Sequence, residues 1–456
     1  MQEEYHNHGN VCEFDSKDWE ILKEFNHYSL ILHYKHANVK GTVTVPKNLV
    51  NPEYLFSKCI IEDGCTIIFQ SGVKCIRGMF KGCTFGRNVK IIGLRSALPN
   101  CVDATELFCS CRFSSEVYLD SVLKVDCDSG IENMFAYSNY EVAFKHKVFE
   151  LTTDCSCYFG YGFKGAVLGE NCFDCIELNC LKDSTDFSLY GLFEESIITK
   201  KEILFKTTKD DRVLLNSAFR EAKFKVNKFK LCVTAKDNAE GVLCNAFERA
   251  DLPMFLSLDV NPQRCKIPQE VMEHYLNSGV FDDYYYPSYY HMFEGSSPKY
   301  VHFSERMFNG PEEAYLGMFG GCNLPSYITA SEPQEIMRQF NEAYKWYESQ
   351  PDDILEQCKR ELIKLLSSGK SVSVATKLLQ DKYAYIDIEK ISENVSTVLT
   401  EECSKNVLNL FEIPSGSSYC RYTIGDVVEK LVKAGYPRDV VNECVIGYIR
   451  DQYISL

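Results

Sequence analysis

A phenylalanine preceded by a second apolar residue, and followed three residues later by a small one, recurs through the first half of the chain. The eight copies are separated by 24, 28, 27, 24, 34, 26 and 28 residues. Their anchor phenylalanines are Phe56, Phe80, Phe108, Phe135, Phe159, Phe193, Phe219 and Phe247. A repeat of this length predicts a solenoid, in which each unit packs only against its neighbours.

A short β-rich segment follows roughly ten residues after each anchor, as at 65–69, 89–94 and 228–233. Apolar and polar residues alternate in these segments, which places one face of each strand inside. Stacked in parallel, the strands would form one continuous sheet along the solenoid. The phenylalanine turns would line the opposite wall, with a small residue where successive coils come close.

Composition divides the chain into four parts. These are an N-terminal cap at 1–50, the solenoid at 51–262, an irregular continuation with a tyrosine-rich insertion at 263–330, and a helical domain at 331–456. A short helix is expected at 18–25 in the cap. Phe293 and Phe319 again follow a methionine and precede a small residue by three, so the repeat should resume after the insertion.

The last part of the chain has helical periodicity and helix-ending glycines. The predicted helices cover 333–349, 353–367, 372–383, 387–410, 424–434 and 438–451. The segment Val427–Pro437 is similar to part of the RecX-type three-helix modules. An excess of acidic residues in this region opposes DNA binding.

The best copies of the repeat are Gly78–Cys83, Asn133–Ser138 and Gly317–Cys322, each with Met-Phe-x-x-Cys or Met-Phe-x-x-Ser. These elements resemble the BspA-like leucine-rich repeats of bacterial, phage and protist proteins, over roughly residues 51–322. The resemblance implies protein recognition and not catalysis. With the helical tail it gives an α+β fold class, in which a leucine-rich-repeat-like β-solenoid is followed by an all-α domain.

The net charge of −15 opposes a general nucleic-acid binder and an anionic membrane surface. It suits a protein partner with a basic, nucleic-acid-binding surface. The N-terminus has no apolar signal segment, and no apolar run approaches a membrane span. The 22 cysteines, several at the small repeat position, are expected to be reduced in a cytoplasmic protein, in the host cytoplasm if the gene is viral.

Cys155, Cys157, Cys172 and Cys175 are the best candidate metal ligands, because two cysteine pairs can supply four thiolates to tetrahedral zinc. The first pair has one intervening residue, whereas closed zinc sites usually have two to four. The alternative is that these cysteines are small core residues. No cofactor other than this zinc is expected.

Five tyrosines in the insertion are the best binding candidates: Tyr284, Tyr285, Tyr286, Tyr289 and Tyr290. Tyrosine offers a large amphipathic contact area at low entropic cost and is enriched at binding hot spots. The alternative is that these rings pack down over the solenoid as a cap.

No Gly-x-Ser-x-Gly, His-Glu-x-x-His or phosphate-binding glycine loop occurs in a suitable context. We therefore expect a non-enzymatic protein-binding scaffold. A more specific version is a phage or mobile-element inhibitor of an intracellular host defence complex. The alternatives are a structural component of a virion or large assembly, and a cysteine- or zinc-dependent enzyme.

Overall fold

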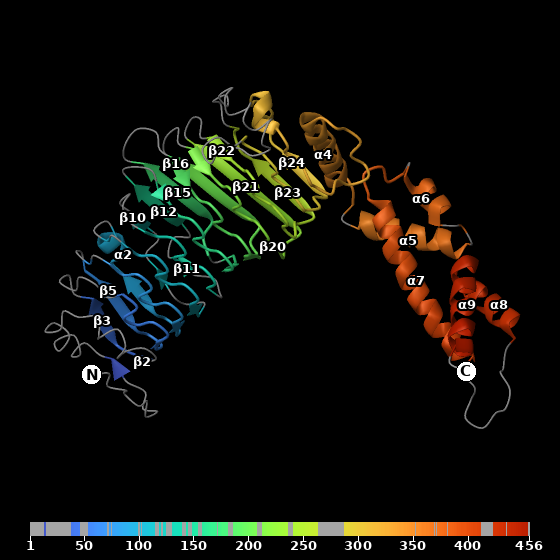
Figure 1. The fold of residues 1–456 in the computed structure, drawn as a ribbon, viewed down its shortest axis with the longest axis horizontal. Helices are drawn as coiled ribbons and strands as arrows, with labels where there is room; N and C mark the ends of the chain where they lie inside the picture. Colours follow the sequence, from blue (N-terminus) through green and yellow to red (C-terminus); the bar gives the residue numbers. More distant parts are fainter. Residues whose placement is uncertain are drawn as a thin grey trace. The chain divides into compact units, whose positions relative to one another are not determined.

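A computed structural model shows a β-solenoid followed by a helical C-terminal region (Figure 1). It divides into two compact units, Met1–Leu324 with Ala330–Asn341, and Pro325–Thr329 with Glu342–Leu456. The described residues are 13–14, 38–45, 53–70, 73, 75–98, 101, 103–114, 118–119, 122–124, 130–138, 143–144, 148–153, 157–170, 172–180, 186–207, 212–235, 240–262, 287–351, 353–368, 370, 372–380, 382–411, 423–434 and 436–454. The helix expected at 18–25 lies outside them.

Parallel strands that follow the anchor turns form the main wall of the solenoid, as two sheets. The five-stranded sheet contains β3 (Thr42–Val45), β5 (Thr66–Phe69), β7 (Lys90–Ile92), β9 (Tyr118–Leu119) and β11 (Ala143–Phe144). The seven-stranded sheet contains β10 (Val122–Lys124), β12 (Val148–Thr153), β15 (Cys175–Cys180), β18 (Glu202–Thr207), β21 (Lys228–Ala235), β23 (Phe255–Asp259) and β24 (Tyr300–Phe303). The predicted strands and their parallel pairing are confirmed, but the prediction that they form a single continuous sheet was wrong. The coil after Phe108 makes two short strands, β9 for the first sheet and β10 for the second, so the wall divides there.

Shorter strands form the remaining walls, also in parallel. One sheet contains β1 (Glu13–Phe14), β2 (Asn38–Val39), β4 (Ile60–Ile61), β6 (Thr84–Phe85) and β8 (Arg112–Phe113). Another contains β13 (Cys157–Tyr158), β16 (Asp186–Ser188), β19 (Arg212–Leu214) and β22 (Glu240–Val242). The last contains β14 (Val167–Leu168), β17 (Ile197–Ile198) and β20 (Lys223–Phe224), and a short helix, α2 (Leu94–Ala97), follows β7.

The anchor phenylalanines form one continuous stack of rings along the solenoid, all buried except the last, Phe319, which is partly buried. Successive ring centroids lie between 5.1 and 5.9 Å apart. The stack is Phe56, Phe80, Phe108, Phe135, Phe163, Phe193, Phe219, Phe247, Phe293 and Phe319. Aromatic stacking adds to the large apolar area that each ring buries. The predicted resumption of the repeat at Phe293 and Phe319 is confirmed.

One predicted anchor was wrong, because Phe163 and not Phe159 occupies the fifth place in the stack. Phe159 lies four residues earlier in the turn, at the place taken by Leu189 and Leu215 in the next two coils. The residue before Phe163 is Gly162, so the coil lacks the apolar pair that marks the others. A Cβ on Gly162 would lie 2.5 Å from the Phe159 ring. The larger ring at 159 therefore requires the glycine at 162.

Each anchor turn contains two residues in the left-handed region, two places before and two places after the anchor. Around Phe80 these are Gly78 and Gly82, with φ of 54° and 74°. Around Phe219 they are Ser217 and Glu221, with φ of 54° and 57°. This conformation is cheap for glycine and costs other residues roughly 1–2 kcal/mol. The hydrogen bonds between stacked turns hold it in place.

In three successive coils the small residue three places after the anchor is polar and hydrogen-bonds to the coil before it. The thiol of Cys83 donates to the carbonyl oxygen of Phe56 at 2.7 Å, and that of Cys111 to Phe80 at 2.9 Å. The hydroxyl of Ser138 donates to Phe108 at 2.8 Å. Each bond links one coil to the anchor of the coil before it, which explains why cysteine and serine both serve here.

The solenoid ends against the first half of α4 (Pro333–Glu348). Phe340 extends the ring stack, with its centroid 5.9 Å from that of Phe319. The side-chain amide of Asn341 pairs with both backbone groups of Phe303 on β24, at 2.7 and 2.8 Å. Helical residues therefore cover the apolar end of the array, as a terminal repeat must. Two 3₁₀ helices, η3 (Glu305–Phe308) and η4 (Glu312–Tyr315), precede this end.

The helical region contains the remaining helices, α5 (Ile354–Ser367), α6 (Val372–Gln380), α7 (Ile388–Phe411), α8 (Ile424–Lys433) and α9 (Arg438–Ile454). The predicted helices are confirmed, with ends displaced by up to three residues. Cys358, Leu362 and Leu379 belong to one core, and Cys403 and Val441 to another.

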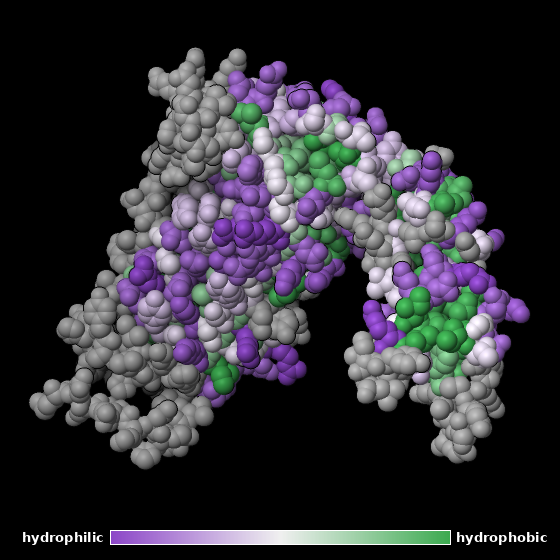
Figure 2. Space-filling model, turned by 45° about the vertical axis from the view of Figure 1, so that its right-hand side comes forward, coloured by the Kyte–Doolittle hydropathy of each residue, from purple (hydrophilic) through white to green (hydrophobic). Residues whose placement is uncertain are grey.

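Large apolar side chains also remain exposed on this region, and Figure 2 shows hydrophobic surface there. None of the described helices combines the length and apolar character that a membrane span requires.

Candidate functional site

Four tyrosine side chains from three consecutive coils lie around Tyr161 and Lys164: Tyr137, Tyr158, Tyr161 itself and Tyr190. Tyr161 and Tyr190 meet edge to face with 5.4 Å between ring centroids, and the Lys164 ammonium lies 5.2 Å from the Tyr161 centroid. Tyr158 and Tyr137 flank them and remain 44% and 50% exposed. Tyr137 acts electrostatically on Lys164, and Tyr158 on Tyr161, so all four are close neighbours. We call these four residues the tyrosine cluster.

Glycines beneath the rings fix the position of the cluster. A Cβ on Gly165 would lie 2.5 Å from the Tyr137 ring, and one on Gly191 would lie 2.6 Å from the Tyr161 ring. Both glycines also have positive φ, so the turn and the ring independently favour glycine there. Partial burial and the neighbouring Tyr190 raise the pKa of Tyr161 to about 12, so its hydroxyl stays protonated at neutral pH.

A buried carboxylate lies next to the tyrosine cluster, between two cations. Lys164, Glu194 and Arg220 each follow the anchor of their own coil by one residue, so they form a column. Lys164 Nζ donates to Glu194 Oε1 at 2.9 Å, and Arg220 donates to the same oxygen at 2.7 Å. The Glu194 side chain is only 2% exposed. Attraction to two cations offsets the cost of removing this carboxylate from water.

Four buried side-chain atoms on three consecutive coils, those of Phe193, Phe219 and Phe247, make no hydrogen bond within the protein. They are Glu194 Oε2, Asn216 Oδ1, Arg220 Nε and Asn245 Oδ1. Among the described residues, Ser304 Oγ is the one further side-chain atom that is buried without a hydrogen-bond partner. An unpaired buried polar group costs roughly 1–3 kcal/mol, so it rarely occurs without a reason. We call the tyrosine cluster together with Lys164, Glu194, Asn216, Arg220 and Asn245 the anchor-turn strip.

The anchor-turn strip is not where the sequence placed the binding tyrosines. Tyr284, Tyr285 and Tyr286 lie outside the described residues. Tyr289 is fully buried, and its hydroxyl donates to the carbonyl oxygen of Val260 at 3.0 Å. It therefore belongs to the core and cannot contact a partner, so this assignment was wrong. Tyr290 is partly buried and stacks on His291 with 4.1 Å between ring centroids.

The predicted zinc ligands are described only in part. Cys155 and the side chain of Cys157 lie outside the described residues. Cys172 and Cys175 are both buried, and burial raises the pKa of the Cys175 thiol to about 11. Within the described ranges, no group of three or more histidine, cysteine, aspartate or glutamate side chains could hold a metal ion.

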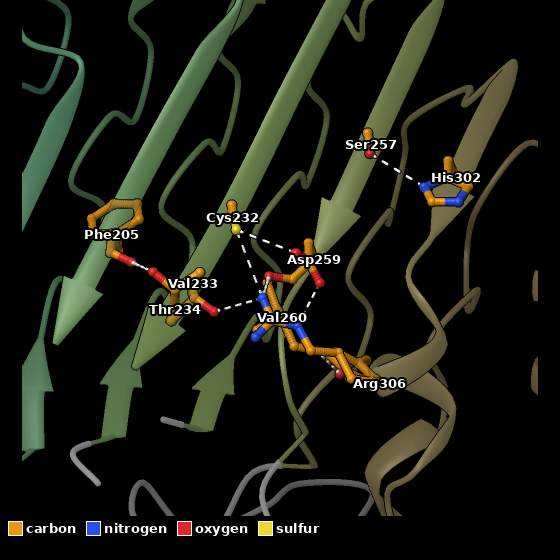
Figure 3. A network of polar contacts seen from close by, with 10 residues as sticks. Phe205, Cys232, Val233, Thr234, Ser257, Asp259, Val260, His302 and Arg306 are labelled. Carbon is orange, nitrogen blue, oxygen red and sulfur yellow. Dashed lines mark hydrogen bonds and ion pairs between the residues drawn. The ribbon is translucent and has the colours of Figure 1, made fainter. Parts of the chain in front are cut away.

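A second polar network lies where β21, β23 and η3 meet (Figure 3). The Arg306 guanidinium donates to the Asp259 carboxylate and to the carbonyl oxygens of Asp259 and Val233, the latter two at 2.6 and 2.8 Å. Burial works to raise the pKa of Asp259, but the nearby Ser304 hydroxyl and Arg306 outweigh it and the pKa is lowered. Ser304 lies close enough to act on the carboxylate, although its hydroxyl lacks a hydrogen bond of good geometry. Arg306 thus ties η3 to two strand ends.

The same region contains residue types that serve as nucleophiles elsewhere. The Cys232 thiol donates to Asp259 at 3.4 Å, and burial followed by Asp259 raises its pKa to about 11. A nucleophilic cysteine needs the opposite shift, toward the thiolate. Ser257 Oγ lies 3.3 Å from His302 Nδ1 on the neighbouring strand (Figure 3). Arg306 and Asp259 give this network a structural role, because they hold η3 against the ends of two strands.

Comparisons with protein-family models, with curated proteins and with solved structures give no match for this chain. The geometry of the anchor-turn strip is therefore the basis for the function proposed below.

Proposed function

We propose that this protein is a non-catalytic scaffold that binds a protein partner through the anchor-turn strip. The observation that carries the proposal is the tyrosine cluster, in which Tyr137 and Tyr158 are about half exposed and Lys164 lies over the Tyr161 ring. Tyrosine and arginine are the residue types that dominate binding energy at protein interfaces. Rings fixed on a rigid backbone lose little entropy on binding.

The architecture supports this use of the surface. Each coil of a solenoid presents the same turn position at a regular spacing, so residues distant in sequence form a continuous binding surface. Tyr137 and Tyr190 are separated by more than fifty residues in the chain but lie on coils only two apart. The leucine-rich-repeat type suggested by the sequence resemblance agrees with this role and is part of the same proposal.

The test is a comparative pull-down from cells that make the protein, using tagged full-length chains and quantitative mass spectrometry. The variant Tyr137→Ala/Tyr158→Ala removes the two exposed rings. The control Ile60→Ala/Ile92→Ala removes two apolar side chains of similar exposure, 50% and 43%, from earlier coils. A partner lost at least 10-fold with the tyrosine variant, and retained with the control, supports the proposal. Equal recovery with all three proteins contradicts it.

A further inference from the structure

The unpaired atoms of the anchor-turn strip constrain the chemistry of its ligand. Glu194 Oε2, Asn216 Oδ1 and Asn245 Oδ1 are acceptors, whereas Arg220 Nε is a donor. A metal ion or an ammonium group would satisfy only the acceptors. A phosphate or carboxylate would satisfy only Arg220. A ligand that offers donors and acceptors side by side would satisfy both kinds of atom.

We propose that the strip binds an extended peptide segment by its main chain, an inference that rests on the proposed function. Peptide N–H groups donate to Asn216 and Asn245, and a peptide carbonyl accepts from Arg220 Nε. Every residue of a peptide except proline carries one such donor and one acceptor. The side chains of the bound segment then lie against the tyrosine cluster.

The spacing of the strip suits this ligand. Glu194, Asn216 and Asn245 come from three consecutive coils, whose main chains are joined by Gly191 N–H donating to Asn216 at 2.9 Å and Ser217 N–H donating to Cys244 at 2.9 Å. Stacked strands lie about 4.8 Å apart, and an extended peptide advances about 3.3 Å per residue. Asparagines on neighbouring coils can therefore meet peptide groups one or two residues apart.

Rotation of the side chains makes the buried atoms reachable. Asn216, Arg220 and Asn245 are all partly exposed as residues, although the named atoms are covered. The terminal torsion of asparagine is broad, so the amide can turn at low cost. Turning the Asn216 and Asn245 amides costs their oxygens no hydrogen bond, because neither oxygen has a partner in the free protein. Arg220 holds Glu194 through another nitrogen, so its Nε can donate to a partner without releasing that bond.

The main chain of the solenoid itself cannot supply this recognition. N–H groups at alternate positions of the anchor turns donate to the next coil, as Asn245 does to Tyr290 at 2.9 Å. The strip therefore lacks the free strand edge that domains binding peptides by strand addition use. Side chains with both donor and acceptor groups have to take that role, which asparagine amides fulfil.

The experiment begins with a phage-displayed library of random linear dodecapeptides, selected on the full-length protein. One enriched peptide is synthesised, and its affinity is measured by calorimetry with each backbone nitrogen methylated in turn. Methylation removes one N–H and leaves the side chains unchanged. We expect about a 10-fold loss at two or more central positions, the effect of one hydrogen bond each. The variant Asn216→Ala/Asn245→Ala should weaken the unmethylated peptide about 100-fold.

The control variant Asn309→Ala/Asn323→Ala removes two exposed asparagines from later coils and should bind normally. Peptides that bind the asparagine variant and the methylated forms undiminished would overturn main-chain recognition. If the same peptides still require Tyr158, the proposed protein-binding strip stands without it. Failure to enrich any peptide, or binding of oligosaccharides on a glycan array in place of peptides, would also overturn the inference.

Discussion

Phe135 and Phe163 stack face to face, with ring centroids 5.1 Å apart and ring planes 5° from parallel. With Phe163 in place, the steps on either side of it become 28 and 30 residues, in place of 24 and 34. The coil that looked least regular in sequence is therefore regular in structure. It differs from the other coils at two positions, where a large ring at Phe159 is compensated by the absence of a side chain at Gly162.

This compensation predicts that the two positions are energetically coupled. Gly162→Ala should destabilise the protein by roughly 1–3 kcal/mol, because the new Cβ would overlap the Phe159 ring. The double variant Phe159→Leu/Gly162→Ala recreates the leucine and alanine of the Phe219 coil, Leu215 and Ala218, and should recover most of that loss. Urea denaturation of the single and double variants measures the coupling. Additive effects would show that the two side chains do not share one space.

The left-handed turn positions predict a graded response to alanine. Gly64→Ala, at φ 72° with nothing within 4 Å of the new Cβ, should cost only the backbone strain of about 1 kcal/mol. Gly78→Ala adds a contact of 2.2 Å with the Tyr54 ring and should cost about 1–2 kcal/mol more. Thermal denaturation of both variants gives the comparison. Equal losses would mean that Tyr54 does not lie over Gly78.

The Arg306–Asp259 pair predicts a dependence on acid. The pKa of Asp259 is lowered in the folded state, so its stabilising effect is complete above the unfolded pKa of about 3.9 and is lost as the pH falls through the folded value. Asp259→Asn should therefore reduce the free energy of unfolding by roughly 1–3 kcal/mol at pH 7. The difference from the unmodified protein should shrink below about pH 4. A difference that is constant from pH 7 to pH 3 would exclude this pairing.

The buried thiols predict a loss of stability in alkali. Burial, followed by the nearby Glu248, raises the pKa of Cys244 to about 12, whereas a cysteine in the unfolded chain ionises near 8.5–9. The folded state therefore excludes the thiolate, and the stability due to this group falls as the pH rises above about 9. Between about pH 9 and pH 10.5, the Cys244→Ala variant should therefore lose about 2 kcal/mol less free energy of unfolding than the unmodified protein. Unfolding curves at several alkaline pH values provide the measurement, and identical slopes for both proteins would refute it.

The sequence was sufficient to predict the solenoid and the C-terminal helices, because both follow from local periodicity. A phenylalanine every 24 to 30 residues with a small residue at +3 is typical of stacked coils. The fifth anchor was misassigned since Gly162 replaces the apolar marker. The left-handed pairs were not visible, because residues as different as glycine, serine, glutamate and tyrosine occupy them. Hydrogen bonding between coils, and not residue type, fixes that conformation.

The anchor-turn strip could not be predicted from the sequence, for a related reason. Tyr161 and Tyr190 meet only because coils stack. The misassigned anchor at Phe159 shifts the register of the coil that contains Tyr158 and Tyr161. The local density of tyrosines at 284–290 drew attention instead, although Tyr289 is core. With the register based on Phe163, the alternating Lys164, Glu194 and Arg220 would have been recognisable as one column.

The most direct test of the account is site-specific photo-crosslinking from the tyrosine cluster. Benzoyl-phenylalanine is incorporated at position 158, and at position 92 as a control of similar exposure, in full-length protein within cells that make it. The account predicts a discrete cross-linked protein partner from position 158, lost when Tyr137 and Tyr190 are replaced by alanine, and none from position 92. The same cross-links from both positions, or none from position 158, would contradict it.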